Sequence, residues 1–236
     1  MRSICDIAGV HAVLDLLFPR DCVLCGGRIA QAGGATYPLC RSCAASLCSL
    51  SGPRCPRCGK TLVSEEGLCM DCRGKEFSCG EVLPLFRYEG DAATLISAYK
   101  SGGRKSLAAF WAELLERELR NRWPGRCIVP VPPRPEKAKA GEIDQIELLV
   151  RQLEARGFLI ARVLRRAPSA QQKSLSRKER LANSRAAYSL MPGAELSAEV
   201  VLLDDVFTTG ATIEACAAAL KAGGADRVCA LVLAAD

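Results

Sequence analysis

The sequence lacks any apolar run long enough to cross a bilayer, which takes roughly 18 to 20 residues. Residues 1–20 also lack the marks of a secretory signal, because they carry Asp6 and Asp15, no long apolar core and no small-residue cleavage site. We predict instead an amphipathic helix over residues 1–20. Its apolar positions are Ile7, Val10, Val13, Leu14 and Leu17. We therefore expect a cytoplasmic protein with no membrane span.

Rings are scarce as well: aromatic residues make up 5% of the chain, and there is one histidine. Between residues 21 and 80 the only aromatic residues are Tyr37 and Phe77, too few for a platform on which nucleic-acid bases stack. His11 falls in the predicted N-terminal helix, where we expect a surface or packing role. The sequence thus shows no convincing general base and no evident base-recognition pocket.

Composition is otherwise that of a soluble globular protein, with 49% hydrophobic and 25% charged residues. The length of 236 residues is enough for one ordinary domain plus a smaller one. The net charge of +6 indicates anionic partners, and it leaves phosphates, nucleic acid and acidic lipid open.

Cysteine is unusually frequent, with fourteen residues, and eleven of them lie between Cys5 and Cys79. Without a secretory signal, these are expected to be thiolates on metal rather than disulfides. Four CxxC pairs carry most of them: Cys22/Cys25, Cys40/Cys43, Cys55/Cys58 and Cys69/Cys72. Two such pairs joined by a short loop complete a tetrahedral zinc site. Sequential pairing predicts two zinc ribbons in tandem, and interleaved pairing is the alternative.

The remaining thiols of this region, Cys48 and Cys79, are expected to pack rather than to bind metal. Redox chemistry of the thioredoxin type fits poorly, because no βαβ pattern surrounds the four pairs. Zinc ribbons can brace a fold, dock a partner or bind nucleic acid; the lack of rings favours the first two roles. Cys25 and Cys58 are each followed by glycine, which lets backbone N–H groups approach the sulfurs.

From Val82 onward, strand patterns alternate with helix patterns, which predicts an α/β fold with a parallel sheet flanked by helices. The expected strands are 82–89, 126–132, 158–164, 199–204 and one within 222–235, and the expected helices are 91–100, 104–123, 142–157 and 211–221. The predicted domains are the N-terminal helix 1–20, a double zinc ribbon 21–80 and an α/β domain 81–236.

One stretch, "VVLLDDVFTTGAT" at 200–212, joins an apolar strand to two acids and a small, hydroxyl-rich turn before a helix. Backbone N–H groups at a helix N-terminus suit a phosphate. The loop residues are Thr208, Thr209, Gly210, Ala211 and Thr212. Asp204 and Asp205 cannot bind phosphate directly, but they can accept hydrogen bonds from a diol or act through magnesium. A sugar phosphate carries both of these halves.

This stretch resembles the phosphoribosyl pyrophosphate (PRPP) motif of type I phosphoribosyltransferases. With the cysteine-rich front end, the whole chain resembles the ComF family of competence-related proteins. The resemblance rests also on "LLFPRDCVLC", "YEGDAATLISAYKSGGR", "IVPVP" and "LRRAPSAQQKSLSRKERLANSRAAY", in that order. It implies a type I phosphoribosyltransferase-like sheet with an N-terminal zinc-ribbon module.

The resemblance also implies roles for particular residues. Asp204 and Asp205 should contact the ribose hydroxyls, residues 208–212 the 5-phosphate, and Pro132, Pro133 and Arg134 the pyrophosphate. The polar stretch 165–187 resembles a mobile loop that closes over the site. Its candidate residues are Arg165, Arg166, Gln172, Arg180 and Asn183. Arg165, Arg166 and Arg180 are the candidate catalytic cations, because departing pyrophosphate needs cations or magnesium.

One stretch departs from the family pattern. Where relatives often carry a basic tract ending in R-G-F-N-Q, this chain has Gly141, Glu142, Ile143, Asp144 and Gln145. The change lowers the positive potential near the expected pyrophosphate site, and Lys137 and Lys139 compensate in part. It puts turnover in more doubt than PRPP binding.

Three hypotheses follow. The first is a protein that binds PRPP or a related ribose phosphate, with zinc and magnesium as cofactors, and acts as an accessory factor in the uptake of single-stranded DNA. The second is an active phosphoribosyltransferase with a nitrogen acceptor. The third is a nucleic-acid binder that uses the ribbons and the stretch 165–187 to hold single-stranded DNA. DNA-uptake or recombination proteins are further expected partners.

Overall fold

The computed structural model describes residues 21–29, 37–47, 50, 52–63, 66–101, 103–135, 144–167 and 187–236. Its centre is a four-stranded parallel sheet of order β1-β6-β5-β2. The strands are β1 (Glu81–Arg87), β2 (Cys127–Pro130), β5 (Glu199–Phe207) and β6 (Arg227–Ala235). The expected α/β fold with a parallel sheet is therefore confirmed.

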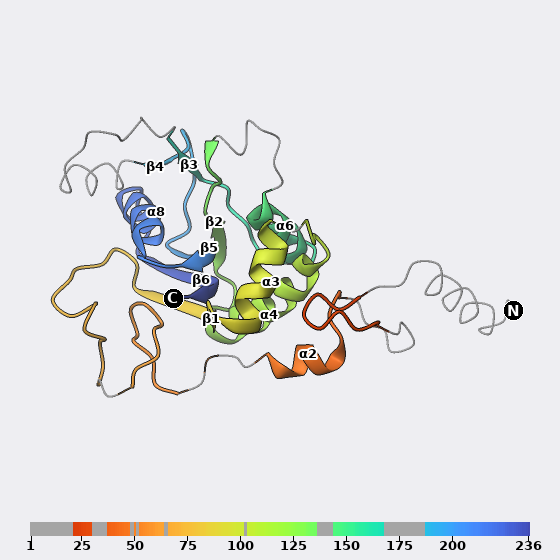
Figure 1. Ribbon diagram of the computed structural model, residues 1–236. Helices are drawn as coiled ribbons and strands as arrows, with labels where there is room; N and C mark the ends of the chain where they lie inside the picture. Colours follow the sequence, from red (N-terminus) through yellow and green to blue (C-terminus); the bar gives the residue numbers. More distant parts are fainter. Residues whose placement is uncertain are drawn as a thin grey trace, which may run out of the picture.

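Helices cover both faces of this sheet (Figure 1). One face packs against α3 (Gly90–Lys100), α4 (Leu107–Arg122) and α6 (Gln145–Glu154). The other packs against α8 (Ala211–Ala222) and a two-stranded antiparallel sheet of β3 (Leu164–Arg166) and β4 (Tyr188–Leu190). The short helix α2 (Arg41–Ser46) lies in the cysteine-rich part.

The helices form where the apolar spacing predicts them. In α4 the positions Leu107, Phe110, Trp111, Leu115 and Leu119 are buried, which places one stripe of the helix against the core. The helix α6 begins with a side-chain cap, in which the carboxylate of Asp144 accepts a hydrogen bond from the N–H of Ile146 at 2.9 Å. No helix in the described ranges has both the length and the apolar character to span a membrane.

Two predicted strands differ from the structure. The strand expected at 199–204 continues to Phe207, because β6 is equally long and Val206 and Phe207 pair with Ala234 and Ala235. The acid pair therefore lies inside β5 and not at its end. The segment 158–164 is not a strand of the sheet: it makes one isolated bridge, Ile128 to Ile160, before its last residue enters β3.

The outer edge of the sheet is covered by residues 50 and 52–59 of the cysteine-rich part. The N–H of Val82 donates to the carbonyl of Arg57 at 3.1 Å, and the carbonyl of Pro84 accepts from Arg54 at 3.2 Å. Proline has no N–H, so Pro84 is tolerated on an edge strand such as β1. This cover hides an edge that would otherwise be open to pairing with another chain.

Close approach at this edge requires glycine at position 59. Gly59 has a φ of +73°, and a Cβ there would lie 2.1 Å from Cδ of Pro84. Gly74, in the same cysteine-rich part, has a φ of +68° and nothing within 4 Å of its Cβ position. The two glycines therefore share the left-handed backbone but differ in available space.

We predict that Gly59→Ala lowers the free energy of unfolding more than Gly74→Ala does. The left-handed backbone should cost each variant about 1–2 kcal/mol. The clash with Pro84 should cost Gly59→Ala about 1–3 kcal/mol more. Denaturant unfolding of the zinc-loaded proteins measures both, and equal losses would contradict this account of the edge.

Candidate functional site

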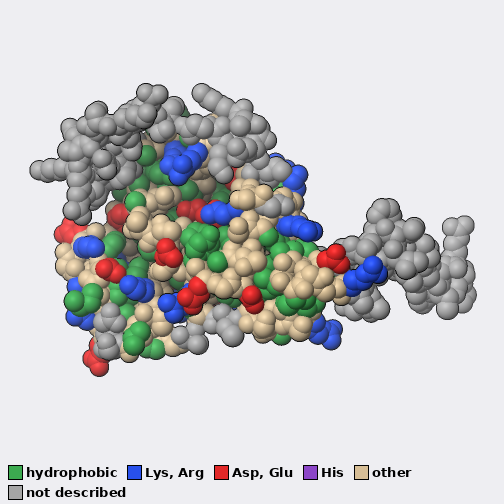
Figure 2. Space-filling view, in the orientation of Figure 1, with side chains coloured by type: hydrophobic (Ala, Val, Ile, Leu, Met, Phe, Trp, Pro, Cys, Tyr) green, Lys and Arg blue, Asp and Glu red, His purple; other side chains and the backbone are tan. Residues whose placement is uncertain are grey.

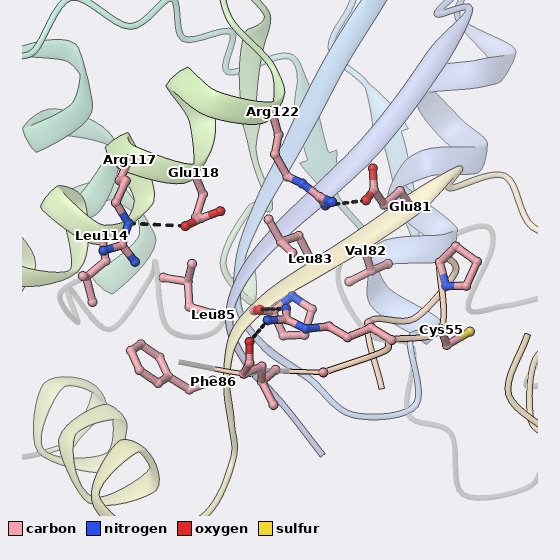
Figure 3. Close-up of a pocket in the computed structure, with 16 residues that line it drawn as sticks. Cys55, Glu81, Val82, Leu83, Leu85, Phe86, Leu114, Arg117, Glu118 and Arg122 are labelled. Carbon is pink, nitrogen blue, oxygen red and sulfur yellow. Dashed lines mark hydrogen bonds and ion pairs between the residues drawn. The ribbon is translucent and has the colours of Figure 1, made fainter. Parts of the chain in front are cut away.

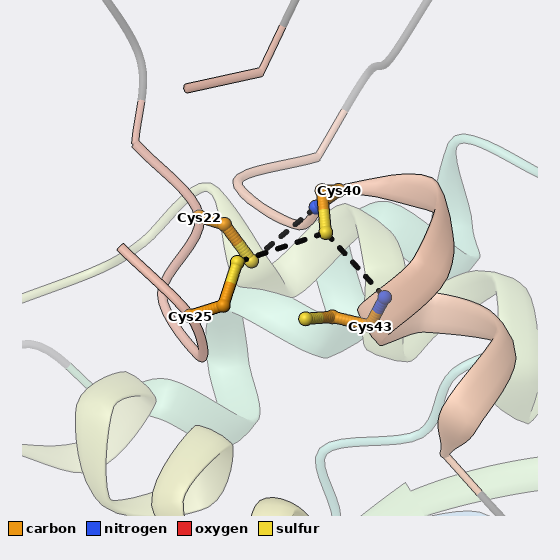
Figure 4. A group of neighbouring side chains, drawn as sticks. All are labelled: Cys22, Cys25, Cys40 and Cys43. Atoms are coloured by element: carbon orange, nitrogen blue, oxygen red, sulfur yellow. Dashed lines mark hydrogen bonds between the residues drawn. The ribbon is translucent and has the colours of Figure 1, made fainter. Parts of the chain in front are cut away.

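Four cysteine sulfurs converge in the first cluster, formed by Cys22, Cys25, Cys40 and Cys43 (Figure 4). All four lie within 4.8 Å of one another, and the sulfurs of Cys25 and Cys40 are 3.9 Å apart. Cys40 is the N-cap of α2, and the N–H of Cys43 donates to its sulfur at 3.4 Å. The N–H of Gly27 donates to the sulfur of Cys25 at 3.4 Å, which is the approach that glycine after CxxC was predicted to allow.

The second cluster joins Cys55, Cys58, Cys69 and Cys72, again within 4.8 Å. The sulfurs of Cys58 and Cys69 lie 3.7 Å apart. Sequential pairing of the four CxxC motifs is thus confirmed, and the interleaved alternative is wrong. Cys79 is buried outside both clusters, as predicted for a packed thiol, whereas Cys48 lies outside the described residues.

The donor sets of both clusters fit zinc. Four thiolates at 2.3 Å from one zinc ion place neighbouring sulfurs about 3.8 Å apart, close to the two distances given above. Burial raises the pKa of the Cys55 thiol, but N–H groups of Cys69, Cys58 and Arg57 outweigh it and bring the pKa to about 7. A hydrogen bond to Ser42 and the N–H of Cys43 lower the pKa of Cys40 to about 6. Hydrogen bonds thus favour the thiolate form of one cysteine in each cluster, the form that binds a cation.

A different group of polar residues meets where β5 carries the acid pair. Successive side chains of a strand point to opposite faces, so Asp204 and Asp205 have different surroundings. Asp204 follows Val200 and Leu202, which pack on the α8 face, and Asp205 follows Val201 and Leu203 on the other. The sequence prediction had treated the two acids as one pair.

Asp204 is held in a setting that favours its proton. Burial raises the pKa of this carboxyl to about 7, and the negative charge of Asp205 adds to the rise. Positive charges of Lys100 and Arg166 lower it in part. At neutral pH the side chain is therefore poised between accepting and donating a hydrogen bond.

Asp205 makes an ion pair with Lys100, the last residue of α3, at 2.8 Å. The backbone around this lysine is fixed, because the side-chain amide of Gln145 donates to the carbonyl of Lys100 at 2.8 Å. Asp144 is a second acid on this side: burial raises the pKa of its carboxyl, and the charge of Asp205 contributes to the rise. The positive charge of Lys100 therefore offsets the repulsion between the carboxylate of Asp205 and these neighbouring acids.

The loop after β5 forms a small hollow of ≈30 Å³ at the start of α8. Its lining includes all five predicted loop residues: Thr208, Thr209, Gly210, Ala211 and Thr212. Gly210 is the N-cap with a φ of +76°, and a Cβ there would lie 2.7 Å from the ring of Phe207. The first intrahelical bond runs from the N–H of Glu214 to the carbonyl of Gly210 at 2.9 Å, so the N–H groups before it have no acceptor in the helix.

Other predicted site residues approach the same edge from neighbouring strands. The N–H of Val131 donates to the carbonyl of Leu203 at 3.0 Å, so Pro132 and Arg134 leave β2 beside the acids. Pro132 is half-buried and Arg134 is exposed. Both lie in the described part of the segment that ends at residue 135.

Strand β3 carries two of the predicted arginines, Arg165 and Arg166. Arg166 lies over the ring of Tyr188 at 5.2 Å and is near enough to Asp204 to lower its pKa. Arg165 instead reaches across to β4, where it donates to the hydroxyl of Ser189 at 2.9 Å. The structure therefore brings Arg166, but not Arg165, toward the acid pair. Arg180, Gln172 and Asn183 lie outside the described residues, as do Lys137, Lys139 and residues 141–143.

Sequence reasoning missed three residues of this group: Lys100, Asp144 and Tyr188. Lys100 stood only as the last residue of a predicted helix, and Asp144 only as a departure from the family pattern. Tyr188 packs on Arg166 from β4, whose pairing with β3 joins distant parts of the chain. The signal that could have found them is their position. Each lies at a helix end or in a strand close to the carboxyl ends of the strands of the predicted sheet.

A larger hollow of ≈540 Å³ lies elsewhere, between the second cluster, β1 and α4 (Figure 3). Leu83, Leu85 and Phe86 line it, and the Arg122–Glu81 ion pair at 2.7 Å lies at one side. Neither Asp204 nor Asp205 contributes to it. On the described part of the face in Figure 2, basic and acidic side chains are interspersed, without a broad patch of one sign.

The fold and the two clusters define an α/β protein in which a cysteine-rich zinc-ribbon module precedes the strands of the sheet in the sequence. Residues 13–73 match the double zinc ribbon domain. Competence protein ComFC of Streptococcus pneumoniae (strain ATCC BAA-255 / R6) is 29% identical over 195 residues, covering 80% of this chain and 84% of that protein. Competence protein ComFC of Bacillus subtilis (strain 168) is 24% identical over 243 residues, covering 92% of each. The chain is thus similar to ComFC proteins over most of its length and matches the double zinc ribbon domain at residues 13–73, in agreement with the resemblance seen in the sequence.

We predict two zinc ions per chain, one in each cluster. Cys25→Ser should remove the ion of the first cluster and Cys58→Ser that of the second, because a tetrahedral thiolate site that loses one ligand binds zinc weakly. Cys127→Ser, which changes a buried cysteine of β2, is the matched control and should keep both ions. Elemental analysis of the purified chains gives the count, and a wild-type protein without zinc would overturn the assignment.

The raised pKa of Asp204 predicts a pH dependence of stability. Between about pH 4 and pH 7 the folded chain holds a proton at Asp204 that the unfolded chain releases, so stability falls as pH rises through this window. Asp204→Asn should remove up to about 1.4 kcal/mol of that fall per pH unit.

Denaturant unfolding of the zinc-loaded proteins from about pH 5.5 to about pH 7.5 measures this change. Asp226→Asn, at the opposite end of the sheet before β6, is the control and should follow the wild type. If Asp204→Asn also follows the wild type, the buried proton is assigned to the wrong group.

Proposed function

We propose that this chain is a ComFC-like protein that binds PRPP or a related ribose phosphate at the carboxyl ends of its sheet strands. One observation carries the proposal: a carboxylate pair on β5 runs directly into a loop whose N–H groups open the helix α8. The two halves match the two halves of a ribose phosphate. The matched relatives are competence proteins by name, and we extend that role to this chain.

The phosphate half is the loop 208–212. An anion there meets N–H groups that lack acceptors in α8, of which the N–H of Ala211 donates to the hydroxyl oxygen of Thr209 at 3.4 Å. The anion also gains from the positive end of the helix dipole. Gly210 supports this role, because its left-handed conformation turns the chain from β5 into the helix. Thr208 and Thr209 are exposed, so their hydroxyl groups are available as further donors.

The ribose half is the acid pair. A diol presents two O–H donors, and Asp204 and Asp205 offer acceptors from the two faces of one strand. Asp205 can accept a hydrogen bond from the ribose once its 2.8 Å ion pair with Lys100 opens, and Lys100 can then form an ion pair with an anionic group of the ligand. Binding of an anionic sugar thus exchanges one ion pair for another, which limits the cost of desolvating Lys100.

The contacts proposed for the pyrophosphate group of PRPP rest on fewer residues. Arg134 leaves β2 beside the acids, and Arg166 lies near Asp204. Magnesium would neutralise the diphosphate, and Asp204 and Asp205 are the carboxylates that would hold it, directly or through its water ligands. Asp144 adds negative charge on the Asp205 side, where a diphosphate needs the opposite sign. This balance of charge favours binding of the sugar phosphate over rapid transfer chemistry.

We therefore propose an accessory role in natural competence, with binding as the primary activity. An active transferase would release pyrophosphate from PRPP in the presence of a nitrogen acceptor. A screen of nucleobases and amines for pyrophosphate release separates the two. Release with any acceptor would establish the transferase, and binding without release supports the accessory role.

The binding claim predicts that PRPP with magnesium raises the melting temperature. At a ligand concentration of about 100 times Kd, the gain of about 2.7 kcal/mol corresponds to a shift of roughly 5 to 10 °C for a chain of this size. Asp205→Asn should abolish the shift, because it removes an acceptor for the ribose and the partner of Lys100. Asp226→Asn is the matched control and should keep it. A full shift in Asp205→Asn, measured against its own baseline, would contradict the site.

A further inference from the structure

The first turn of α8 is fastened to the cysteine-rich part of the chain. The carboxylate of Glu214 accepts a hydrogen bond from the N–H of Ser78 and a second, at 3.3 Å, from the N–H of Cys79. These two residues lie between the last ligand of the second cluster, Cys72, and the first residue of β1. An acid in the first turn of a helix is also favoured by the helix dipole, so its position is well fixed.

The same segment is held from the other side by the second cluster. Arg57 lies between the ligands Cys55 and Cys58, and its guanidinium donates to the carbonyls of Cys79 and Gly80 at 3.4 Å each. That guanidinium also lies 5.8 Å from the ring centroid of Phe77. A side chain from inside the CxxC turn therefore fixes the residues that Glu214 contacts.

Glu214 then reaches the loop 208–212 through its own backbone. Its N–H donates to the carbonyl of Gly210 at 2.9 Å, the bond that closes the first turn of α8. Thr212, the last residue of the loop, is two positions before it. One residue thus receives the contact from the second cluster and closes the turn that presents the loop N–H groups.

The first cluster is attached differently. Tyr37 packs edge-on against Phe110 of α4 at 5.7 Å, and its hydroxyl donates to Glu113 of the same helix. The helix α4 covers the face of the sheet opposite to α8 (Figure 1). The chain therefore provides its own control, a chemically similar cluster fixed to the other face.

We propose that the second cluster positions the phosphate loop through Arg57 and Glu214, so that metal in this cluster raises the affinity for the sugar phosphate. The inference rests on the function proposed above. Glu214 is a positioning residue, because it acts through the loop and not on the ligand. Coupling between two binding sites is reciprocal, so the sugar phosphate must also strengthen zinc binding in the second cluster.

Electrostatics and positioning predict opposite signs at Glu214. If its charge alone mattered, Glu214→Gln would remove a negative group near the phosphate and strengthen binding. If it positions the loop, Glu214→Gln weakens binding, since a neutral amide oxygen holds the two N–H groups less strongly than a carboxylate does. We expect about tenfold weaker binding, within the usual range for coupled sites.

The first test is calorimetric titration of the zinc-loaded full chain with ribose 5-phosphate. Glu214→Gln and Arg57→Ala should each bind about tenfold more weakly than the wild type while keeping two zinc ions. Arg73→Ala is the matched control: this arginine donates to the carbonyl of Leu68 within the same ribbon at 2.9 Å, outside the path to Glu214. It should bind as the wild type does.

The second test uses zinc itself as the readout. In Cys25→Ser, which holds zinc in the second cluster, ribose 5-phosphate should slow zinc transfer to a colorimetric chelator. In Cys58→Ser, which holds zinc in the first cluster, the sugar phosphate should leave the transfer rate unchanged. A role confined to folding stability would not separate the two clusters in this way.

The outcomes distinguish the two proposals. A zinc-loaded wild type that does not bind ribose 5-phosphate or PRPP would overturn the proposed function, and the coupling with it. Binding by the wild type with equal affinity in Glu214→Gln and Arg57→Ala would overturn the coupling alone. So would tighter binding in Glu214→Gln, or equal protection of zinc in both clusters.

Discussion

The alternation of side chains along β5 is the constraint on which the candidate site depends. In a strand covered on both faces, a charged side chain loses solvent whichever face it points to. Two consecutive acids point to opposite faces, so each must be paired or neutralised separately. Asp205 is paired with Lys100 on the face of α3 and α6. Asp204 is on the face of α8 and has its pKa raised to about 7 by burial. The repulsion expected between the two acids is thus reduced in two ways: Lys100 neutralises Asp205, and Asp204 tends to hold a proton.

The cysteine-rich part adds a second constraint, because its two clusters attach to different parts of one sheet. The first packs on α4 through Tyr37, and the second covers the edge strand β1 and contacts the first turn of α8. The close approach at Gly59 shows that this cover is tightly fitted. A structural role for the zinc ribbons therefore follows from where they lie, and it extends to the loop proposed to bind phosphate.

Local patterns in the sequence predicted much of this arrangement. The CxxC spacing predicted both clusters, and the stretch 199–212 predicted β5, its loop and the start of α8. What the sequence could not supply is long-range pairing: Lys100 meets Asp205, and β3 meets β4, across stretches with no common local pattern. Strand propensity also stops at acids, so the continuation of β5 to Phe207 depends on its neighbour β6. The two-residue period of a strand also implies that Asp204 and Asp205 point to opposite faces, whereas the sequence prediction treated them as one pair.

A crystal structure of the zinc-loaded chain with ribose 5-phosphate tests the central claim most directly. The account predicts the phosphate at the N-terminus of α8, within hydrogen-bond distance of the N–H groups of residues 208–212. It predicts the ribose hydroxyls on Asp204 and Asp205, with Lys100 turned away from Asp205. A phosphate bound in the hollow beside β1, or a sugar that contacts neither acid, would contradict it.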